Sequence, residues 1–242
     1  MATHRSQPYI WITWLTGLLA GDRSCEWAAW FKAHYRDYDR VPDSFDQARW
    51  LMEHTDLLNQ AHARLEADGY TVFREAQNAF KLKGSSGIVL HVRPDLVAFR
   101  DDSALIVDTK SGKQRPSDTI QVMIYMWALP LALKQFRRAI SAAEASDIVQ
   151  GTDVCRALRL YQGTFDGQVV YKDAAIPIPA NAVDKDFQDR LVALIKRVGG
   201  TEPLRSVPSP TECGFCPIAR TECEWRIEGL AADIDLEELE DF

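Results

Sequence analysis

Residues 88–99 and 104–109 form two apolar segments that are separated by a short polar stretch at 100–103. This pattern predicts two strands joined by a tight turn. Each strand carries an acid: Asp95 lies in the first and Asp108 near the end of the second. A carboxylate within an apolar strand is costly unless a cation or a hydrogen-bonding partner accompanies it. The chain is therefore expected to fold around a strand pair that holds two acids close together.

Lys110 adds a cation to this pair of acids. Side chains two apart on a strand point to the same face, so Lys110 is expected beside Asp108. Mg²⁺ prefers oxygen ligands and is often held by one or two carboxylates, and a divalent ion activates water for phosphodiester cleavage. Thr109 is expected to face away, although its backbone carbonyl offers a further metal ligand. From these residues alone, a surface ion pair between Asp108 and Lys110 is the alternative to a metal site.

The rest of the chain alternates between helical and strand-like patterns. Apolar residues at helical intervals predict helices at 9–20, 25–37, 44–68, 116–134 and 183–198. Strands are expected at 70–80, 88–99 and 104–109, followed by a hairpin of 158–162 and 169–178 with its turn at 165–167. These elements predict an α/β fold with a mixed central sheet flanked by helices. Residues 1–230 are expected to form one domain, followed by an acidic tail at 231–242.

Charge is unevenly distributed along the 242 residues. The net charge is −7, but residues 231–242 hold six acids and no base, which leaves −1 for the other 230 residues. A nearly neutral body is compatible with a local basic groove for nucleic acid. The basic residues that would contribute to such a groove are Lys110, Lys113, Arg115, Arg137 and Arg138. The tail is expected to be a solubilising segment, with docking of a protein partner as the alternative.

Membrane insertion and disulfide stabilisation are not expected. The chain has no run of about eighteen apolar residues. The apolar stretch at 9–20 lacks a dense basic flank and a small-residue cleavage site, so it does not resemble a signal peptide. The count of five cysteines is odd, which argues against a disulfide framework. These features favour a cytoplasmic protein.

Pro94-Asp95 followed by Asp108-Thr109-Lys110 resembles the core motif of the PD-(D/E)XK nuclease superfamily. The resemblance implies a restriction-endonuclease-like core and a metal-dependent DNA nuclease that leaves a 5′-phosphate and a 3′-hydroxyl. It further implies that the two acids and the Thr109 carbonyl bind Mg²⁺ or Mn²⁺, while Lys110 positions the attacking water. An aspartate stands at 108 where iron–sulfur members of the superfamily often have glutamate.

Gln121 and Tyr125 are four residues apart on the helix expected after the strand pair, and so share one of its faces. They resemble the Q-x-x-x-Y motif of the RecB-like branch of the superfamily. The resemblance implies that they brace Lys110 or contact a DNA phosphate. Members of this branch also have a metal-binding histidine on an earlier helix. His54 is favoured for this role, and His62, eight residues later, is the alternative.

Four of the five cysteines have ligand spacing, since Cys25 is followed much later by Cys213-x2-Cys216-x6-Cys223. This arrangement resembles that of CRISPR-associated iron–sulfur exonucleases and the AddB nuclease module. The resemblance implies a 4Fe–4S cluster on four thiolates that joins the N- and C-terminal helices. A tetrahedral zinc site is the alternative, because a Cys-x2-Cys pair also suits zinc. Cys155 is expected to be a core residue.

Together, the resemblances imply an exonuclease that acts on single-stranded DNA or DNA ends. The implied setting is DNA repair, recombination, CRISPR adaptation or phage DNA processing. The alternative is a non-catalytic DNA-binding or assembly subunit with a vestigial site, against which the complete acid, acid and lysine set argues. Trp127 and Tyr161 are candidates for base stacking, with core packing as the alternative role.

Overall fold

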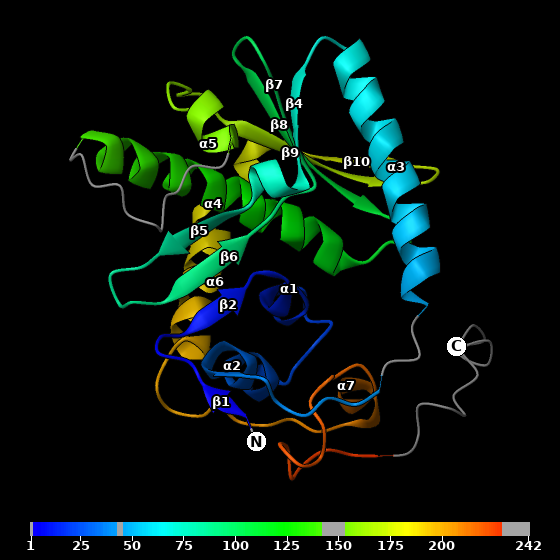
Figure 1. Ribbon diagram of the computed structural model, residues 1–242, viewed down its shortest axis with the longest axis vertical. Helices are drawn as coiled ribbons and strands as arrows, with labels where there is room; N and C mark the ends of the chain where they lie inside the picture. Colours follow the sequence, from blue (N-terminus) through cyan, green and yellow to red (C-terminus); the bar gives the residue numbers. More distant parts are fainter. Residues whose placement is uncertain (1, 43–45, 142–152, 229–242) are drawn as a thin grey trace.

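The computed structural model describes residues 2–42, 46–141 and 153–228, and within them three β-sheets and the helices that cover them (Figure 1). Strand β7 (Leu96–Arg100) and strand β8 (Ser103–Lys110) form the expected antiparallel pair, in which Leu96 lies opposite Val107. They lie within a five-stranded sheet in the order β10-β9-β8-β7-β4. The sheet is mixed because β8 pairs in parallel with β9 (Phe165–Tyr171).

The five-stranded sheet is covered by a long helix on each face (Figure 1). Helix α3 (Gln47–Ala67) packs through Leu58 and Leu65 against Leu96 and Val107. Helix α4 (Pro116–Ser141) covers the alternate residues of the same strands, such as Val97 and Ile106. Because side chains alternate along a strand, Asp108 points toward α4 and Thr109 toward α3. This alternation sets the geometry of the candidate site.

Close contact between α4 and the sheet depends on Gly167 in β9. A Cβ atom at this position would lie 2.5 Å from Val122 Cγ1 and 2.6 Å from Met126 Sδ. Both of these side chains belong to α4, and each is adjacent in sequence to one residue of the Gln121/Tyr125 pair. The absence of a side chain at 167 therefore allows the helix that carries this pair to approach the strands.

The expected strand at 88–99 is two strands that belong to different sheets, which corrects the prediction. Strand β6 (Val89–Val92) lies between β2 (Tyr9–Trp11) and β5 (Phe80–Lys83) in a three-stranded sheet, whereas β7 begins at Leu96 in the five-stranded one. The break falls at Pro94, which has no N–H to donate to a ladder.

The expected strand at 70–80 is also interrupted. Strand β4 (Thr71–Arg74) gives way to a 3₁₀ turn, η1 (Glu75–Asn78), before β5 begins at Phe80. Glu75 has a φ of 34°, in the left-handed region that non-glycine residues rarely adopt. The turn redirects the chain from one sheet to the other and brings Asn78 behind Asp95.

The first expected helix, at 9–20, begins too early. Tyr9, Ile10 and Trp11 form β2, with Ile10 buried and Trp11 partly exposed, and helix α1 covers only Thr13–Ala20. Aromatic and β-branched residues favour an extended backbone where a neighbouring strand is available, and here β6 supplies it. The next expected helix, at 25–37, is α2 (Glu26–His34). It ends where β3 (Tyr35–Arg36) pairs with β1 (Thr3–His4).

The expected strand at 158–162 is wrong. Residues Asp153–Ala157 form helix α5, which holds Cys155 in the core, and hydrogen-bonded turns continue to Tyr161. The alternating apolar pattern there arises from turns instead of a strand. The hairpin consists of β9 and β10 (Ala175–Ile178), so its turn lies at 172–174 and not at 165–167.

The remaining helices agree more closely with expectation. Helix α3 begins at Gln47, and α4 runs on to Ser141, beyond the expected end at 134. Helix α6 (Lys185–Val198) follows the short turn η3 (Ala180–Ala182), and α7 (Pro210–Gly214) carries the first cysteine of the C-terminal group. The acidic tail at 231–242 lies outside the described residues.

The architecture is a mixed α/β fold with sheets flanked by helices, consistent with a restriction-endonuclease-like core. The two ends of the described chain meet at one end of the molecule, where α2 and α7 lie near each other (Figure 1). No helix in the described ranges has the length and apolar character required to cross a bilayer.

Candidate active site

A cleft of about 850 Å³ opens beside the end of β8. Its walls come from the β2–α1 junction, α3, residues in and around β6 and β7, the end of β8 and the start of α4. Every residue expected to form the metal and catalytic site from the sequence, apart from the alternative His62, lines this cleft: His54, Asp95, Asp108, Thr109, Lys110, Gln121 and Tyr125. The tertiary structure therefore brings the predicted set together.

Asp108 and Lys110 form an ion pair in the cleft, in which Asp108 is buried and Lys110 is partly buried. Lys110 Nζ lies 2.7 Å from Asp108 Oδ2, and Asp108 is 1% exposed. Burial and the neighbouring Asp95 raise the pKa of Asp108 to about 7, although Lys110 counteracts this. Burial opposes the charge on Lys110, but the carboxylates of Asp108 and Asp95 raise its pKa above the ordinary value. The pair is thus not the exposed surface contact that stood as the alternative.

Gln121 connects the ion pair to Tyr125 and uses both ends of its amide. Lys110 Nζ donates to Gln121 Oε1 at 3.1 Å, while Gln121 Nε2 donates to Asp108 Oδ1 at 2.9 Å and to Tyr125 Oη at 2.7 Å. Burial and the nearby acids raise the pKa of Tyr125 well above its ordinary value, which keeps its hydroxyl protonated. The amide fixes the relative positions of the lysine and the carboxylate.

Asp95 lies just before β7 and is bound by Thr109. The backbone N–H and the hydroxyl of Thr109 donate to Asp95 Oδ2 at 2.7 and 2.8 Å. The side chain of Thr109 faces away from Asp108 as expected, yet it is part of the site because its hydroxyl donates to Asp95. Hydrogen bonds from the described residues reach Oδ2 of Asp95 and leave Oδ1 without one.

The two candidate histidines have different surroundings. His54 lines the cleft, with Nε2 3.9 Å from Asp95 Oδ2 and Nδ1 3.4 Å from Thr109 Oγ1. His62 does not line it and instead has Nδ1 3.2 Å from Glu66 Oε2, one turn further along α3. The geometry therefore favours His54 as the residue available to a metal beside Asp95.

Asn78 supports Asp95 from behind, a role that its sequence position did not indicate. It is fully buried, and its Nδ2 donates to the backbone carbonyls of Phe73, Pro94 and Asp95 at 2.8, 3.4 and 3.3 Å. These bonds hold the break between β6 and β7 in place. An asparagine inside the strand expected at 70–80, where this residue type is disfavoured, was the available signal, but its partners are set by the tertiary fold.

Two further residues of the cleft, Asp118 and Arg93, were not singled out from the sequence. Asp118 is buried and accepts hydrogen bonds from Arg115 N at 3.1 Å and from Tyr171 Oη at 2.8 Å, which holds the entry to α4. Arg93 pairs with Glu75 at 3.2 Å at another part of the wall. Asp118, Arg93 and Glu75 all line the cleft.

Two partly exposed tryptophans also line the cleft, 38% exposed at Trp11 and 40% at Trp50. Trp50 stacks on His54 with ring centroids 5.0 Å apart, and Trp11 lies 3.9 Å from His91. The aromatic residues suggested by the sequence for base stacking, Trp127 and Tyr161, do not line this cleft.

The expected basic groove is present only in part. Lys113 and Arg115 line the cleft with Lys110, as expected. Arg137 instead donates to the backbone carbonyls of Arg159 and Tyr161, at 2.7 and 2.6 Å. Arg138 lines a different pocket. The two arginines at the end of α4 are therefore not part of this groove, because α4 carries them away from the cleft.

The donors in the cleft suit a hard divalent cation, judged by their chemistry. Asp108 Oδ2 is buried and its described partner is the ammonium of Lys110 at 2.7 Å, and a carboxylate oxygen can accept a second contact. The carboxylates of Asp95 and Asp108 are the oxygen ligands that Mg²⁺ prefers, and Mg²⁺ usually completes its coordination with water. Among the described residues, no three His, Cys, Asp or Glu side chains are arranged as a ready ion site.

The four cysteines with ligand spacing line a single cavity, although Cys25 is nearly two hundred residues from the others. Cys213 is buried, and Cys25, Cys216 and Cys223 are partly buried. The backbone N–H of Ile227 donates to Cys213 Sγ at 3.4 Å. Thus the fold places all four thiols around one space, and Cys155 lies elsewhere in the core.

The mixed α/β fold and a cleft containing two acids and a lysine are typical of metal-dependent nucleases. The chain belongs to the PD-(D/E)XK nuclease superfamily, whose model matches residues 18–222. Among solved structures, one described as "Crystal structure of SSO0001" is similar over 88% of this chain and 85% of its own, with 10% identity and a TM-score of 0.43. No curated protein matched the chain.

Proposed function

We propose that this nuclease is a deoxyribonuclease that depends on Mg²⁺ or Mn²⁺ and hydrolyses phosphodiesters in the cleft beside β8. The observation that carries the proposal is the hydrogen-bonded set of Asp108, Lys110 and Gln121 with Asp95 beside it. A structural ion pair would need neither a second carboxylate nor a glutamine that orients both members. Such a buried and charged arrangement in a cleft is typical of catalytic sites.

Asp95 and Asp108 would hold the metal, with His54 and the backbone carbonyl of Thr109 as further ligands. When bound, a divalent ion stabilises charge on the phosphoryl oxygens and lowers the pKa of water. Thr109 fixes Asp95 through Oδ2 and leaves Oδ1 for a ligand. Metal binding would also favour the ionised form of Asp108, whose pKa is raised to about 7 without it.

Lys110 would orient the attacking water and offset negative charge that develops on phosphate. Its raised pKa keeps it charged at neutral pH, which suits an electrostatic role. Gln121 would act as a positioning residue because its amide joins Lys110, Asp108 and Tyr125. Tyr125, held protonated by burial, would fix the orientation of that amide.

The proposed substrate is single-stranded DNA or the end of a duplex, with exonuclease action. Trp11 and Trp50 support this, because partly exposed aromatic rings in the cleft offer surfaces on which unpaired bases stack. Lys113 and Arg115 are the cations available to the DNA backbone in the same cleft. DNA repair, recombination or the processing of foreign DNA is the proposed setting.

The four cysteines that line one cavity would hold a 4Fe–4S cluster with a structural role. A zinc site needs four sulfurs about 2.3 Å from one ion, and hence within about 4 Å of each other. A cluster binds one thiolate per iron and accepts a wider spacing. The shared cavity of the four thiols and their spacing in the sequence support the cluster, and a zinc site is the alternative. Burial raises the pKa of Cys216, and the nearby Lys32 ammonium counteracts this and favours the thiolate.

The proposed activity is tested by digestion of end-labelled DNA with Lys110→Ala and a matched control, Lys185→Ala. Lys185 is exposed on α6 and forms a surface ion pair with Asp189. The wild type and Lys185→Ala should degrade DNA only with Mg²⁺ or Mn²⁺, and Lys110→Ala should be slower by about 10²- to 10³-fold.

Substrates with free and blocked ends separate exonuclease from endonuclease action in the same assay. The catalytic proposal fails if the wild type cuts no form of DNA with either metal, or if Lys110→Ala matches Lys185→Ala. Retained metal-independent DNA binding in that case would identify a non-catalytic DNA-binding subunit.

A further inference from the structure

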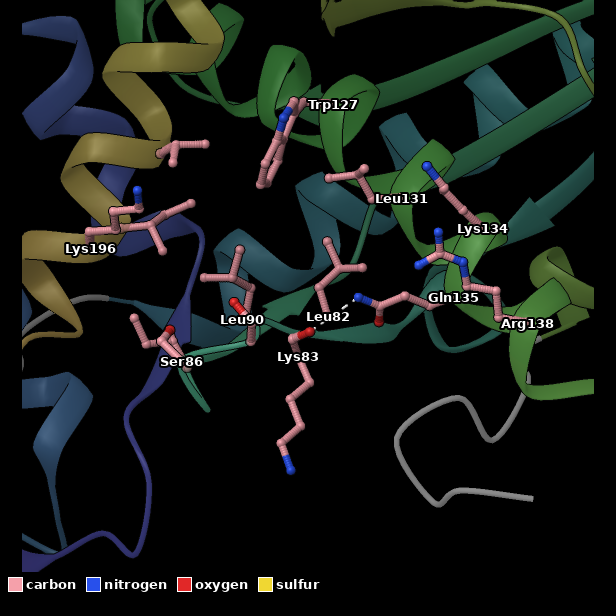
Figure 2. Close-up of a pocket in the computed structure, with 15 residues that line it drawn as sticks. Leu82, Lys83, Ser86, Leu90, Trp127, Leu131, Lys134, Gln135, Arg138 and Lys196 are labelled. Carbon is pink, nitrogen blue, oxygen red and sulfur yellow. Dashed lines mark hydrogen bonds between the residues drawn. The ribbon is translucent and has the colours of Figure 1, made fainter. Parts of the chain in front are cut away.

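A second pocket, of about 350 Å³, lies between α4, α6 and the turn that joins β5 to β6 (Figure 2). Its floor is apolar and consists of residues from all three elements: Leu82, Ile88, Leu90, Trp127, Leu131 and Ile195. The volume falls in the range of sites that bind small molecules or single chemical groups. Gln135 Nε2 donates to the carbonyl of Lys83 at 3.1 Å and joins α4 to β5 beside the pocket (Figure 2).

This pocket is separate from the active-site cleft and shares no lining residue with it. Strand β6 contributes to both because its side chains alternate. Leu90 faces the second pocket, whereas His91 faces the cleft. The two cavities therefore lie on opposite faces of the three-stranded sheet, and a ligand in the second pocket would not contact the proposed catalytic residues.

The rim of the pocket is positively charged. Lys134 and Arg138 lie on α4 at one side, and Lys196 lies on α6 at the other (Figure 2). Among the residues that the structure describes, no acid lines the pocket, although the whole chain has a net charge of −7. None of these three cations forms an ion pair with another residue in the described parts of the chain. The side chain of Lys83 points away from the apolar floor (Figure 2).

An apolar floor with a cationic rim fits a ligand that is both anionic and partly apolar. Trp127 offers an indole ring at the pocket, which can stack against a flat aromatic group (Figure 2). Lys134 and Arg138 are four apart on one helix face, with Cβ atoms separated by about 5–6 Å. A row of cations beside an aromatic side chain is the combination by which proteins bind single-stranded nucleic acid.

We propose that this pocket is a secondary binding site for a single DNA strand, which inserts one base against Trp127 and places its phosphates on Lys134 and Arg138. The choice of DNA as the ligand rests on the proposed nuclease function. The site would anchor the part of the strand that is not being cleaved, and so increase affinity for long strands. It would leave the hydrolysis of a substrate too short to reach it unchanged.

The test measures DNA binding in variants that carry Lys110→Ala, in EDTA, so that no cleavage occurs. Lys134→Gln with Arg138→Gln is compared with a control of equal charge change, Arg64→Gln with Lys185→Gln, at exposed sites that line neither pocket. Fluorescence anisotropy of a labelled oligothymidylate, long enough to span both cavities, is measured at several salt concentrations.

The rim variant should bind about 10-fold more weakly than the control. Loss of two phosphate contacts should also reduce the slope of log K against log salt by about 1.4. Trp127→Leu should weaken binding without changing this slope, because it removes stacking and no charge. Thermal unfolding of each variant confirms that the fold is retained.

Equal affinity and equal slope for the rim variant and the control would overturn the proposal. So would an unchanged DNA affinity together with rim-dependent binding of an acidic amphipathic peptide, which would identify a protein partner instead. Rim variants with Lys110 restored should cleave a trinucleotide at the wild-type rate. If the wild type cleaves no DNA but the rim still governs binding, the proposed activity fails and the secondary site stands.

Discussion

Gln121 shows what a single residue contributes to this site. Its amide accepts from Lys110 and donates to both Asp108 and Tyr125, so one side chain determines how the acid and the lysine face each other. Gln121 and Tyr125 share one helix face because they are four residues apart, and this was predicted from the sequence. The bond to Asp108 depends on α4 lying across β8, which no local pattern encodes.

Replacing Gln121 by glutamate should lower kcat by about 10²-fold with a smaller change in KM, because the amide acts through the catalytic residues. The carboxylate would no longer donate to Asp108 and would raise the pKa of that residue further. Gln60→Glu, at an exposed position of α3, provides the same charge change as a control. Steady-state kinetics on labelled DNA would contradict the positioning role if both variants matched the wild type.

At the scale of secondary-structure elements, the site depends on the approach of α4 to the five-stranded sheet. Gly167 allows this approach, since its position leaves room for Val122 and Met126 of the helix. These two residues are adjacent in sequence to Gln121 and Tyr125, so the packing contact and the hydrogen-bonded set lie on the same stretch of α4. Core packing and site geometry are therefore coupled in this element.

Gly167→Ala should lower the free energy of unfolding by about 1–3 kcal/mol, because the added methyl group overpacks a dense contact. Gly112→Ala is a suitable control, since a Cβ atom there meets no atom within 4 Å. Denaturant unfolding monitored by circular dichroism measures both. If Gly167→Ala lowers the free energy of unfolding no more than Gly112→Ala does, α4 can shift to accommodate the methyl group and the close contact is not required.

At the scale of the whole molecule, segments distant in sequence are joined near the cysteine cavity. Arg40 and Ile218 form a β-bridge, and Arg197 pairs with Glu26 at 2.6 Å. A buried aromatic group on α2, which includes Trp27, packs against Ile218. A cluster bound by the four thiols would add a covalent link between these regions, and would stabilise the domain as a unit.

Cys213→Ser should abolish the broad visible absorbance of anaerobically purified protein and lower its Tm, because binding of the metal centre contributes to folding. Cys155→Ser, which changes a core cysteine outside the cavity, should keep the absorbance. Iron, sulfide and zinc are quantified in the same samples. Stoichiometric zinc in a colourless wild-type protein would contradict the cluster and show that the four thiols bind zinc.

The sequence by itself determined the local features: the strand pair with its two acids, the lysine two residues on, and the spacing of the Gln121/Tyr125 pair. Each follows from a period of two or 3.6 residues, which neighbouring residues express directly. The tertiary structure alone decided which sheet the chain joins on each side of the break at Pro94, that Thr109 binds Asp95, and that Trp11 lines the cleft. These depend on contacts between segments far apart in the chain, for which a local pattern holds no information.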